Sequence, residues 1–564
     1  MEKFYLGISL GFNSSACVMS SERGLVSAIS QERLNGQKNT KELPFDAMLE
    51  CIKEAGTKTI EAIAISHYEN ITDEYFERYG KRFNLAASSW ENKIISYLTA
   101  NGIIVNNINI IRVNHHDAHA LSTFAFYDNS ERYYTITSDG FGDGLSARIK
   151  LGDKLISTVS LKNSIALVYQ FVTGALGYKE HQHEGKITGL AAFGEPKYLF
   201  EFESLYSYTV DGNFIDFRDG DYSLTDEEKE QVAASHIIDF DKFLILKRAV
   251  YNLVNDLLAE GASPADIAAT VQEFAERHTL EWILNNCTEK GLNAYIAGGL
   301  FANVKINQRI KDLGIFENVY VCPAMGDEGT AIGAAIAIAG MPVKKISPNQ
   351  CGIVADEKEV YHWFDVLCGN HIDYTIHRID DDNRLAEYIA RVLSQSKIVC
   401  LVKDKMEFGP RALCHRSILY NCDTKETNTW LNDKLGRTEF MPFAPVTREE
   451  VADDLFVNLD GGRDSAKHMT MTFDCTDEFV QNYPAACHID NTARPQIVSF
   501  KEDPFIWSVL ANYQCITGKK ALINTSFNLH NNPIIASTEV AIDSWLKSDT
   551  NILVIGNTVI EKRG

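Results

Sequence analysis

Short apolar runs that end in polar, glycine-containing turns mark the start of the chain. Residues 5–10 form the first run, Gly11 closes it, and a polar turn at 13–15 precedes a second apolar run at 16–19. A run, a tight polar turn and a further run are typical of a β-hairpin. The N-terminus is therefore predicted to begin with two paired strands.

The same pattern returns more than a hundred residues later. The β-rich run 133–138 enters the turn 139–144, Asp-Gly-Phe-Gly-Asp-Gly, and an apolar run resumes at 145–149. Two hairpins of this kind predict two related lobes.

Between residues 224 and 289 the pattern becomes helical, because apolar residues recur at three- and four-residue spacing. They are Ala249, Leu253, Leu257, Leu258, Ile267, Val271 and Phe274. Strands, glycine-rich turns and helices then alternate. The predicted order is a strand at 294–297, the pair Gly298-Gly299, a helix opening at 300–303, a strand at 319–322, a turn at 323–329 and a helix at 330–339. This alternation predicts α/β lobes.

The stretch 341–349, which contains two prolines and two lysines, is the best candidate for a linker. After it, a helix is predicted at 383–395 and a strand at 398–402, and strand-like runs follow at 469–473 and 521–524. We therefore predict an N-terminal domain over 1–345, with lobes of about 1–130 and 131–345, and a C-terminal domain over 350–564.

The charge of the chain excludes one class of partner. It has 54 basic and 76 acidic residues, so its net charge is −22, and a negative field of that size repels an extended polyanion such as nucleic acid. No secretory signal is visible, and the longest weakly polar run, 329–343, is too short to span a bilayer. These features predict a soluble, cytoplasmic protein without membrane or nucleic-acid partners. Twelve scattered cysteines without a CxxC pair favour reduced thiols over disulfides or zinc fingers.

A histidine cluster is the sharpest local feature. The run Asn114-His-His-Asp-Ala-His-Ala120 favours a helix, on which His115 and His119 lie one turn apart and can share a cation. Asp139 and Asp327, each in a glycine-rich turn at a strand end, are the predicted carboxylate ligands. The alternative is that these histidines are solvated or bonded to the backbone.

Glycine-rich turns before helices form a second theme, because they let backbone amides approach a phosphate or ribose. Gly298-Gly299 is one such turn and 326–329 is another. Lys186, which lies between Gly185 and Gly189, is a candidate phosphate contact, although a solvated loop lysine explains the spacing equally well.

Basic residues gather locally in the acidic C-terminal half. From 403 to 437 there are seven basic and five acidic residues, interleaved with apolar ones, so several cationic groups are expected to converge on a partly buried anion site rather than to form a solvated charge run. Further anion-binding candidates are Arg494 and the polar run 524–528. No local signature assembles a catalytic triad or a cysteine nucleophile.

Several of these motifs, in this order, resemble the NodU/CmcH carbamoyltransferases, which act on tobramycin, cephalosporin and nodulation factors. The matching stretches are HHxxHA at 115–120, DGxGD at 139–143, EGKxxGLAxxG at 184–194, GGLxxN at 299–303, KMEFGPRAL at 405–413, NTARPQ at 491–496 and NTSFN at 524–528, together with Gln31-Glu32-Arg33 and Lys38. The resemblance spans nearly the whole chain. It implies an N-terminal domain of the actin-like ATPase superfamily, with two lobes, and a YrdC-like α/β domain at the C-terminus.

The resemblance also implies an activity. The C-terminal domain would use ATP, with Mg²⁺, and carbamoyl phosphate to make carbamoyl adenylate, which moves through an interdomain channel. A hydroxyl of a small acceptor metabolite would then take the carbamoyl group in the N-terminal domain.

Residue roles carry over by motif. The metal, typically Fe(II), would be bound by His115, His119, Asp139 and Asp327. The adenylate would be held by Lys186, Gly189, Gly298, Gly299 and Asn303. The activation site would be lined by Lys405, Arg411, Arg416, Ser417, Arg437, Arg494, Asn524, Ser526 and Asn528. The predicted catalytic residues are Asn13, His116, Lys405, Arg411 and Arg416.

Two departures affect the expected chemistry. Many family members have a histidine in the first hairpin, whereas the matching position here is Asn13, whose neutral amide can orient an acceptor but cannot take its proton. Lys405 replaces the first arginine of the RMEFGPRAL signature, which keeps the charge but loses the planar fork.

Three alternatives remain open at this point. The carbamoyl acceptor could be a protein, as in hydrogenase maturation, or a tRNA, although the chain lacks CxxC pairs and is strongly acidic. The chain could also be a non-catalytic nucleotide sensor, against which the retained histidines and arginines argue. A homodimer is the oligomer that family analogy suggests.

Overall fold

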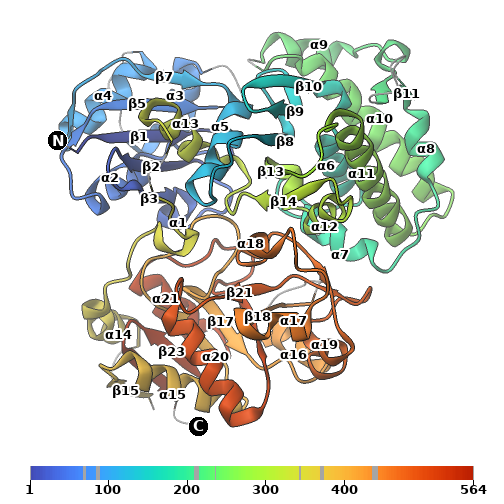
Figure 1. Cartoon of the computed structure of the whole chain (residues 1–564). Helices are drawn as coiled ribbons and strands as arrows, with labels where there is room; N and C mark the ends of the chain where they lie inside the picture. Colours follow the sequence, from blue (N-terminus) through green and yellow to red (C-terminus); the bar gives the residue numbers. More distant parts are fainter. Residues whose placement is uncertain are drawn as a thin grey trace.

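The computed structural model describes residues 2–67, 71–83, 89–208, 215–235, 237–341, 344–368, 374–434 and 442–562. Two lobes lie side by side in the N-terminal part of the chain, and the C-terminal domain lies across both of them (Figure 1). No described helix combines the length and the apolar character needed to cross a membrane.

Each lobe is built on a five-stranded sheet of the same topology. In the first lobe the strand order is β3-β2-β1-β5-β7, with β1 (Phe4–Ser9), β2 (Ser15–Ser20), β3 (Gly24–Ser30), β5 (Ala62–Ser66) and β7 (Ile111–Val113). In the second lobe the order is β10-β9-β8-β13-β14, with β8 (Tyr133–Gly142), β9 (Leu145–Leu151), β10 (Lys154–Ser160), β13 (Leu292–Ala297) and β14 (Phe316–Val321). In both, three antiparallel strands are followed by two parallel ones. The prediction of two related, hairpin-initiated lobes is confirmed.

Helices flank both sheets. In the first lobe the main ones are α2 (Phe45–Glu54), α3 (Asp73–Tyr79) and α4 (Trp90–Ala100). In the second lobe they are α6 (Ile165–Ala175), α7 (Glu184–Ala191), α8 (Leu199–Ser204), α9 (Asp226–Ala233), α10 (Phe240–Ala259), α11 (Pro264–Asn286) and α12 (Val304–Asp312). The buried positions of α11, which include Ile267, Val271 and Phe274, follow the predicted helical spacing.

Two helices join the lobes at their centre, α5 (His115–Ser122) and α13 (Thr330–Ala339). A Cβ atom added at Gly333 of α13 would lie 1.7 Å from the carbonyl oxygen of Ala118 in α5, and one added at Gly7 of β1 would lie 2.0 Å from that of Ala331. The backbones therefore touch without side chains between them. Because α13 packs on the first sheet, the chain returns to the first lobe after it has formed the second. The expected lobe boundaries of 1–130 and 131–345 imply instead that the chain passes from the first lobe to the second only once.

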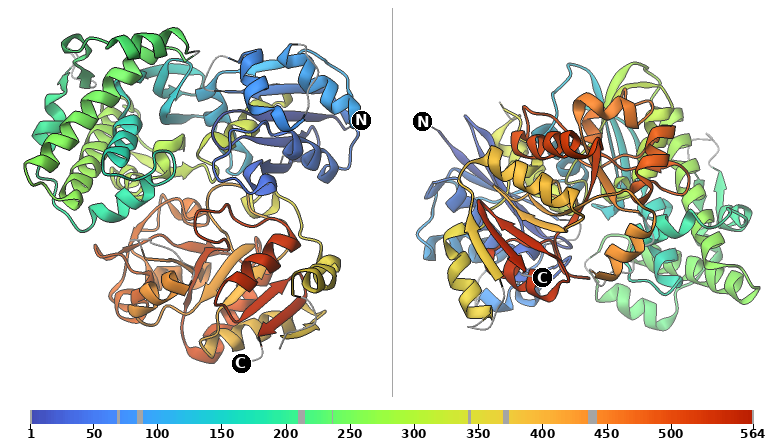
Figure 2. Two further views of the ribbon diagram at one scale, coloured as in Figure 1. Left: turned by 180° about the vertical axis from the view of Figure 1, so that it is seen from behind. Right: turned by 90° about the horizontal axis from the view of Figure 1, so that it is seen from below.

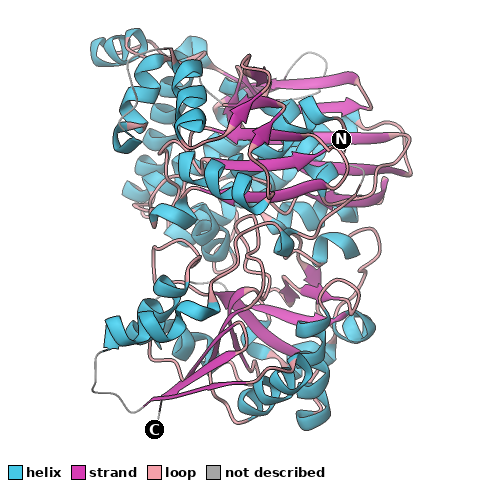
Figure 3. Ribbon diagram, turned by 90° about the vertical axis from the view of Figure 1, so that its left-hand side faces the viewer, coloured by secondary structure: helices cyan, strands magenta, loops and turns pink. Residues whose placement is uncertain are grey.

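The C-terminal domain is built on an eight-stranded mixed sheet, so the prediction of a two-lobed α/β domain followed by a second α/β domain is confirmed. Its strand order is β15-β24-β23-β16-β17-β22-β18-β21, with β15 (Tyr374–Arg378), β16 (Val399–Val402), β17 (Arg416–Tyr420), β18 (Ala444–Arg448), β21 (Gln496–Val498), β22 (Ala521–Ser526), β23 (Ile552–Ile555) and β24 (Thr558–Lys562). Helices α14 (Val360–Cys368), α15 (Asp382–Ser394), α16 (Glu426–Lys434), α20 (Pro504–Thr517) and α21 (Thr538–Lys547) cover it (Figure 3).

The strand predicted at 469–473 is wrong for most of its length. Only its last residue belongs to a strand, β19 (Phe473–Asp474), which pairs with β20 (Thr492–Ala493). The Thr470 hydroxyl donates to the carbonyl of Ser465, and the Thr472 amide donates to the carbonyl of Val304 in the second lobe. The apolar residues of this run are buried without a sheet, Met469 against Leu413 and Ala444 of the same domain and Phe473 beneath Lys311 of the second lobe.

The C-terminal domain lies against both lobes (Figure 2), and hydrogen bonds to backbone carbonyls join it to them. Toward the first lobe, the amide of Ala28 donates to the carbonyl of Cys351 at 3.0 Å, and Arg33 Nη2 donates to that of Gly409 at 3.0 Å. Toward the second lobe, the amide of Val319 in β14 donates to the carbonyl of Gly461 at 2.7 Å. All three units thus meet around one central region.

Candidate functional site

Four predicted metal ligands meet where the two lobes join. The α5 helix presents His115 and His119 one turn apart, and its start is fixed by Asn114, whose side chain accepts from the amide of Asp117. Asp139 extends from β8, and Asp327 begins the short 3-10 helix η6 (Asp327–Gly329) just before α13.

Two hydroxyls of the first hairpin fix the turn that carries Asp327. Ser9 donates to the carbonyl of Asp327 at 2.8 Å, and Ser15 donates to that of Glu328 at 2.7 Å. The polar residues of the hairpin thereby position a carboxylate more than 300 residues away in the chain.

The ligand atoms of this metal tetrad, which we define as His115, His119, Asp139 and Asp327, all lie within 4.8 Å of one another. Nε2 of His115 is 3.0 Å from Asp139 Oδ2, Nε2 of His119 is 3.4 Å from Asp327 Oδ1, and the two Nε2 atoms are 3.1 Å apart. Within the described part of the chain, Asp327 Oδ1 and both Nδ1 atoms are buried without a hydrogen-bond partner. Two imidazoles and two carboxylates in this arrangement fit a divalent transition metal.

The electrostatics of the tetrad agree with this fit. Burial alone would raise the pKa of Asp139, but the imidazoles of His115 and His119 hold it well below its ordinary value. Burial likewise opposes the charged form of His119, yet Asp139 and Asp327 raise its pKa to about 9. The carboxylates therefore attract positive charge at this point, which is what a bound cation would supply. Asp327 comes from the first lobe and Asp139 from the second, and the two histidines come from α5, which packs on β8 and β13 of the second lobe as well as on α13.

His116 was expected to be catalytic, but its ring lies outside the tetrad. Its Nδ1 is 3.0 Å from Thr137 Oγ1 and its Nε2 is 3.2 Å from the carbonyl of Leu145, and burial lowers its pKa well below the usual value. The side chain is fully buried and does not line the cavity described next. This position is that of a structural residue that ties α5 to the β8–β9 hairpin.

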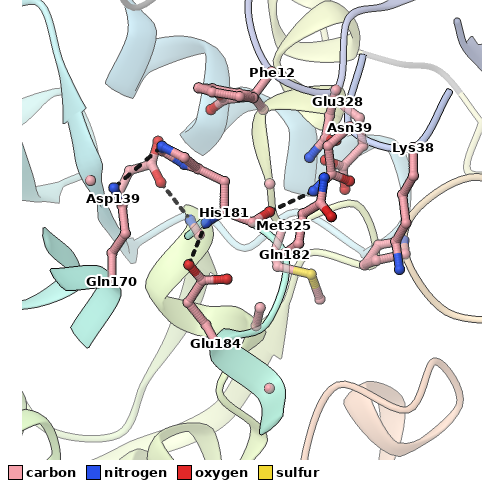
Figure 4. A pocket seen from close by; sticks show the side chains of 18 of the residues that line it. Phe12, Lys38, Asn39, Asp139, Gln170, His181, Gln182, Glu184, Met325 and Glu328 are labelled. Carbon is pink, nitrogen blue, oxygen red and sulfur yellow. Dashed lines mark hydrogen bonds between the residues drawn. The ribbon is translucent and has the colours of Figure 1, made fainter. Parts of the chain in front are cut away.

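A single cavity of about 650 Å³ connects the tetrad to the C-terminal domain. We call it the interdomain cavity, and Figure 4 shows part of its wall. The first lobe contributes Phe12, Asn13, Arg33, Lys38, Asn39, Lys41, Asp327 and Glu328 to it, the second lobe Asp139, Phe141, Gln170, His181, Glu184, Gly299 and Asn303, and the C-terminal domain Arg411, Ser526 and Asn528. The two carboxylates of the metal tetrad and part of the predicted activation site therefore face the same cavity.

Two neighbouring arginines supply positive charge in the C-terminal domain, and Arg411 lines the cavity whereas Arg494 lies behind its wall. Arg411 Nη2 donates to the carbonyl of Ala302 at 3.1 Å, and burial lowers the pKa of Arg411 to about 10. Burial and the neighbouring charge of Arg411 lower the pKa of Arg494 well below its ordinary value. Among the described residues no carboxylate oxygen lies within 4.0 Å of either guanidinium, and both Nε atoms are unpartnered. We call Arg411 and Arg494 the arginine pair, and it is suited to an anion.

Arg416 and Lys405 occupy different surroundings. Arg416 is fully buried in β17 and donates to the carbonyls of Lys403, Asp404, His415 and Ile353, and it does not line the cavity. Its guanidinium thus organises the loop that carries Arg411. Nζ of Lys405 lies 3.4 Å from Oε2 of Glu54 in the first lobe, and Lys405 does not line the cavity.

The remaining activation-site residues divide in the same way. Ser526 and Asn528 line the cavity, and the Ser526 hydroxyl donates a hydrogen bond to Asn528 Oδ1 at 2.6 Å. Asn524 is buried behind them, with its Nδ2 donating to Gln496 Oε1 at 2.6 Å, and Ser417 accepts from the amide of Cys414. Arg437 lies outside the described residues.

Of the predicted adenylate contacts, Gly299 and Asn303 reach the cavity. The amide of Gly299 donates to Asp139 Oδ1 at 3.0 Å, and Asn303 caps α12 while its Nδ2 donates to Gln272 Oε1 at 2.8 Å. A Cβ at Gly298, whose φ is +110°, would lie 2.1 Å from the carbonyl oxygen of Ser138, so this glycine serves the close approach of β8. Lys186 is half-buried on α7 and Gly189 is buried, and neither lines the cavity.

Several residues that face the cavity were not predicted from the sequence, notably Phe12, Gln170, His181, Glu184 and Glu328. Glu184 is the first residue of the glycine-rich motif around Lys186 and His181 lies just before it, and this proximity is the signal that could have indicated them. Burial raises the pKa of Glu184 to about 7 and that of Glu328 to about 7.

The raised pKa of Glu184 predicts a pH-dependent stability. Its carboxyl ionises near pH 4.3 in an unfolded chain and near 7 in the folded one, so the folded state loses stability as the pH rises between these values. Glu184→Gln removes the ionisation and can still accept from the amide of His181. We expect its thermal midpoint to exceed that of the wild type by about 2 °C at pH 8 and to equal it near pH 4.5, as measured by differential scanning calorimetry. The exposed residue Glu227, changed to Gln, should shift neither midpoint; a Glu184→Gln difference that does not depend on pH would contradict the assignment.

Comparison with known proteins identifies the family to which the chain belongs. The description Carbamoyltransferase N-terminus matches residues 5–336, and Carbamoyltransferase C-terminus matches residues 390–562. Nodulation protein NolNO of Sinorhizobium fredii is 28% identical over 98% of this chain and 79% of its own length, and nodulation protein NolO of Bradyrhizobium diazoefficiens is 30% identical over 80% and 79%. The uncharacterized protein MJ1051 of Methanocaldococcus jannaschii is 27% identical over 99% of both chains. Among solved structures, full-length HypF in its phosphate- and nucleotide-bound form is 15% identical with a TM-score of 0.30, over 60% of this chain and 55% of that one. The chain belongs to the carbamoyltransferase family.

Proposed function

We propose that the chain is an ATP-dependent O-carbamoyltransferase with two half-reactions, activation at the arginine pair and transfer at the metal tetrad. The observation that carries the proposal is the interdomain cavity, because one continuous space is lined by Asp139 and Asp327 on one side and by Arg411 on the other. An intermediate made at one end would reach the other within the same cavity, which shortens its exposure to water.

In the activation step, water releases phosphate from carbamoyl phosphate and leaves carbamate. A carbamate oxygen then forms a bond to the α-phosphorus of ATP, the α–β phosphate bridge breaks, and pyrophosphate leaves with Mg²⁺. Arg411 and Arg494 would bind the anionic groups, since their charges have no acidic partner among the described residues. The product is carbamoyl adenylate.

In the transfer step, the acceptor hydroxyl oxygen forms a bond to the carbamoyl carbon. The bond from that carbon to the adenylate oxygen breaks, AMP leaves with the electron pair, and the hydroxyl proton passes to solvent. The four residues of the metal tetrad would hold a divalent ion, for which the resemblance suggests Fe(II), and a bound ion supplies Lewis-acid polarisation of a carbonyl or phosphate oxygen. Asn13 at the cavity wall would orient the acceptor hydroxyl through its amide, and Gly299 and Asn303 would lie along the adenylate.

The size of the cavity favours a small acceptor. Pockets of about 300–1,000 Å³ are typical of small-molecule sites, and the space of about 650 Å³ here is bounded by all three structural units. Transfer to a protein or tRNA requires an opening for a macromolecular segment, and tRNA would also have to approach a chain of net charge −22. The unpaired arginines and the clustered metal ligands disfavour a sensor without catalysis.

One assay tests the proposal. The purified full chain is incubated anaerobically with ATP, Mg²⁺, Fe(II) and carbamoyl phosphate, and pyrophosphate and AMP are measured separately. We expect pyrophosphate release that depends on carbamoyl phosphate. If pyrophosphate release is the same with and without carbamoyl phosphate, the activation half of the proposal is wrong.

A further inference from the structure

His181 occupies an unusual place in the wall of the interdomain cavity. It lies in the connection between α6 and α7, and its φ of +62° is in the left-handed region that few non-glycine residues adopt. Figure 4 shows its ring close to Phe12 and Gln170. A residue with this strained backbone conformation and a polar ring at a cavity wall requires contacts that hold it in place.

Those contacts come from both lobes. The amide of His181 donates to Glu184 Oε1 at 2.6 Å, and its carbonyl accepts from Asn39 Nδ2 at 2.5 Å. The imidazole stacks on Phe12 of the first hairpin, with ring centroids 4.1 Å apart and an interplanar angle of 23°. Lys41 Nζ lies 3.8 Å from the centroid of the same Phe12 ring. Backbone and ring are therefore both fixed.

A chain of hydrogen bonds also fixes which ring nitrogen of His181 carries the proton. It begins at Glu180, whose Oε1 accepts from Tyr251 at 2.5 Å and lies 2.8 Å from Lys247 Nζ. Burial of Glu180 opposes ionisation, but the hydrogen bonds from Lys247, Tyr251 and Gln170 hold its pKa below the ordinary value. Glu180 is thus an ionised carboxylate, which can only accept hydrogen bonds.

The neighbour of Glu180 transmits this constraint. Gln170 must turn its NH₂ group toward Glu180 Oε2, 3.0 Å away, because the opposite orientation of the amide would place the Gln170 carbonyl oxygen against the Glu180 carboxylate, and neither group could donate. The same nitrogen lies 3.3 Å from Nε2 of His181. Nε2 must then be the acceptor, and in a neutral imidazole the proton is on Nδ1.

The ring is neutral at physiological pH, since burial and the charge of Lys41 lower its pKa to about 4. Across the described residues, Nδ1 has no hydrogen-bond partner, and the residue lines the cavity beside Asp139 and Gln170. His181 therefore has one N–H group to donate and no ring nitrogen left to accept a proton.

We infer that His181 is a ligand-binding residue, a neutral Nδ1–H donor that binds an oxygen of the carbamoyl adenylate during transfer. The inference rests on the proposed function for the identity of the ligand. The carbonyl and phosphate oxygens of that ligand are both acceptors, and either is held more strongly as negative charge develops on it. The same geometry excludes His181 as a general base, because neither ring nitrogen is free to take a proton. His181 therefore does not replace the family histidine whose position is Asn13 here.

Two variants separate hydrogen-bond donation from packing. Asparagine and glycine both tolerate a φ of +62°, and both lose the stack on Phe12, but asparagine keeps an N–H near the place of Nδ1. The assay follows a single turnover of ATP and carbamoyl phosphate with Fe(II) and no added acceptor, in which water takes the carbamoyl group. Pyrophosphate reports activation and AMP reports transfer.

We expect His181→Gly to release AMP about 10- to 100-fold more slowly than the wild type. His181→Asn should stay within about fivefold of the wild type, and the pyrophosphate burst of both variants should be unchanged. Equal losses of AMP release in the two variants would show a packing role and overturn the inference, as would an unchanged rate in His181→Gly.

A second measurement does not depend on the reaction. In protein labelled with ¹⁵N-histidine, the ring signals of His181, identified by their loss in His181→Asn, should show a protonated Nδ1 and an unprotonated Nε2 at pH 7. Glu180→Gln, which frees Gln170 to turn, should add the Nε2–H tautomer. A wild-type ring that is protonated on Nε2 would overturn the inference. Absence of pyrophosphate from the wild type would instead refute the proposed function, and the tautomer would still decide whether His181 is the donor described here.

Discussion

Changing His119 to alanine is expected to abolish metal binding and carbamoyl transfer while leaving activation intact. The His119 side chain is fully buried, and its Nε2 faces Asp327 at 3.4 Å and Asp139 at 3.5 Å, so alanine removes one of four ligands and leaves two carboxylates without their imidazole. The metal content of the purified protein should fall from about one ion per chain to less than about a tenth, and AMP release should fall on the order of 10³-fold. Pyrophosphate release should stay within about twofold of the wild type, because the arginine pair is untouched.

The matched control is the next histidine on the same helix. His116→Gln changes a buried imidazole that contacts Thr137 and Leu145 rather than the metal tetrad, so it should retain the ion. Metal analysis by mass spectrometry and the two product assays give all the readouts. If a folded His119→Ala protein lost both half-reactions together, the separation into two sites would be wrong.

Arg411→Ala is expected to show the converse, losing activation and gaining stability. The guanidinium lines the cavity, its Nε atom is buried, and no carboxylate oxygen of the described residues lies within 4.0 Å of it, so its charge is available to the phosphates of ATP or to carbamoyl phosphate. Removing it should lower pyrophosphate release by at least about 100-fold. The thermal midpoint should not fall and should rise slightly, because Arg494 is then relieved of a like charge that now depresses its pKa.

Two controls sharpen this expectation. Arg411→Lys keeps the charge but cannot form the paired hydrogen bonds of a guanidinium, so it should recover only part of the activity. Arg384→Ala removes an exposed arginine of α15 and should leave both half-reactions unchanged. Pyrophosphate release by Arg411→Ala within about twofold of the wild type would exclude this arginine from activation.

The parts of the fold governed by local pattern were predictable from sequence. The α13 helix spans Thr330–Ala339 as predicted, since a run of small apolar residues lies between Gly329 and Gly340. The spacing of His115 and His119 placed them on one face of α5 for the same reason. What the pattern could not provide was the return of α13 to the first lobe, because that depends on close backbone contact at Gly7 and Gly333.

The candidate site was predictable only in part, because similar residues acquire different surroundings in three dimensions. Arg411 and Arg416 are five positions apart and equally basic, yet one faces the cavity and the other is enclosed by four backbone carbonyls. No local pattern distinguishes an arginine that binds carbonyls from one that binds a ligand. His181 was missed for a related reason, since its place depends on Phe12 and Asn39, more than 140 residues earlier.

The distribution of the metal tetrad between the lobes links cation binding to lobe motion. Asp327 is carried by η6, which packs on β1 and β2 of the first lobe, and Asp139 is carried by β8 of the second, whereas His115 and His119 are carried by α5, which packs on α13 and also on β8 and β13. An opening of the lobes would therefore separate the two carboxylates from each other. A cation held by all four groups would therefore stabilise the closed arrangement of the two lobes. By thermodynamic reciprocity, closure of the lobes would raise the affinity for the cation by the same factor by which the cation favours closure.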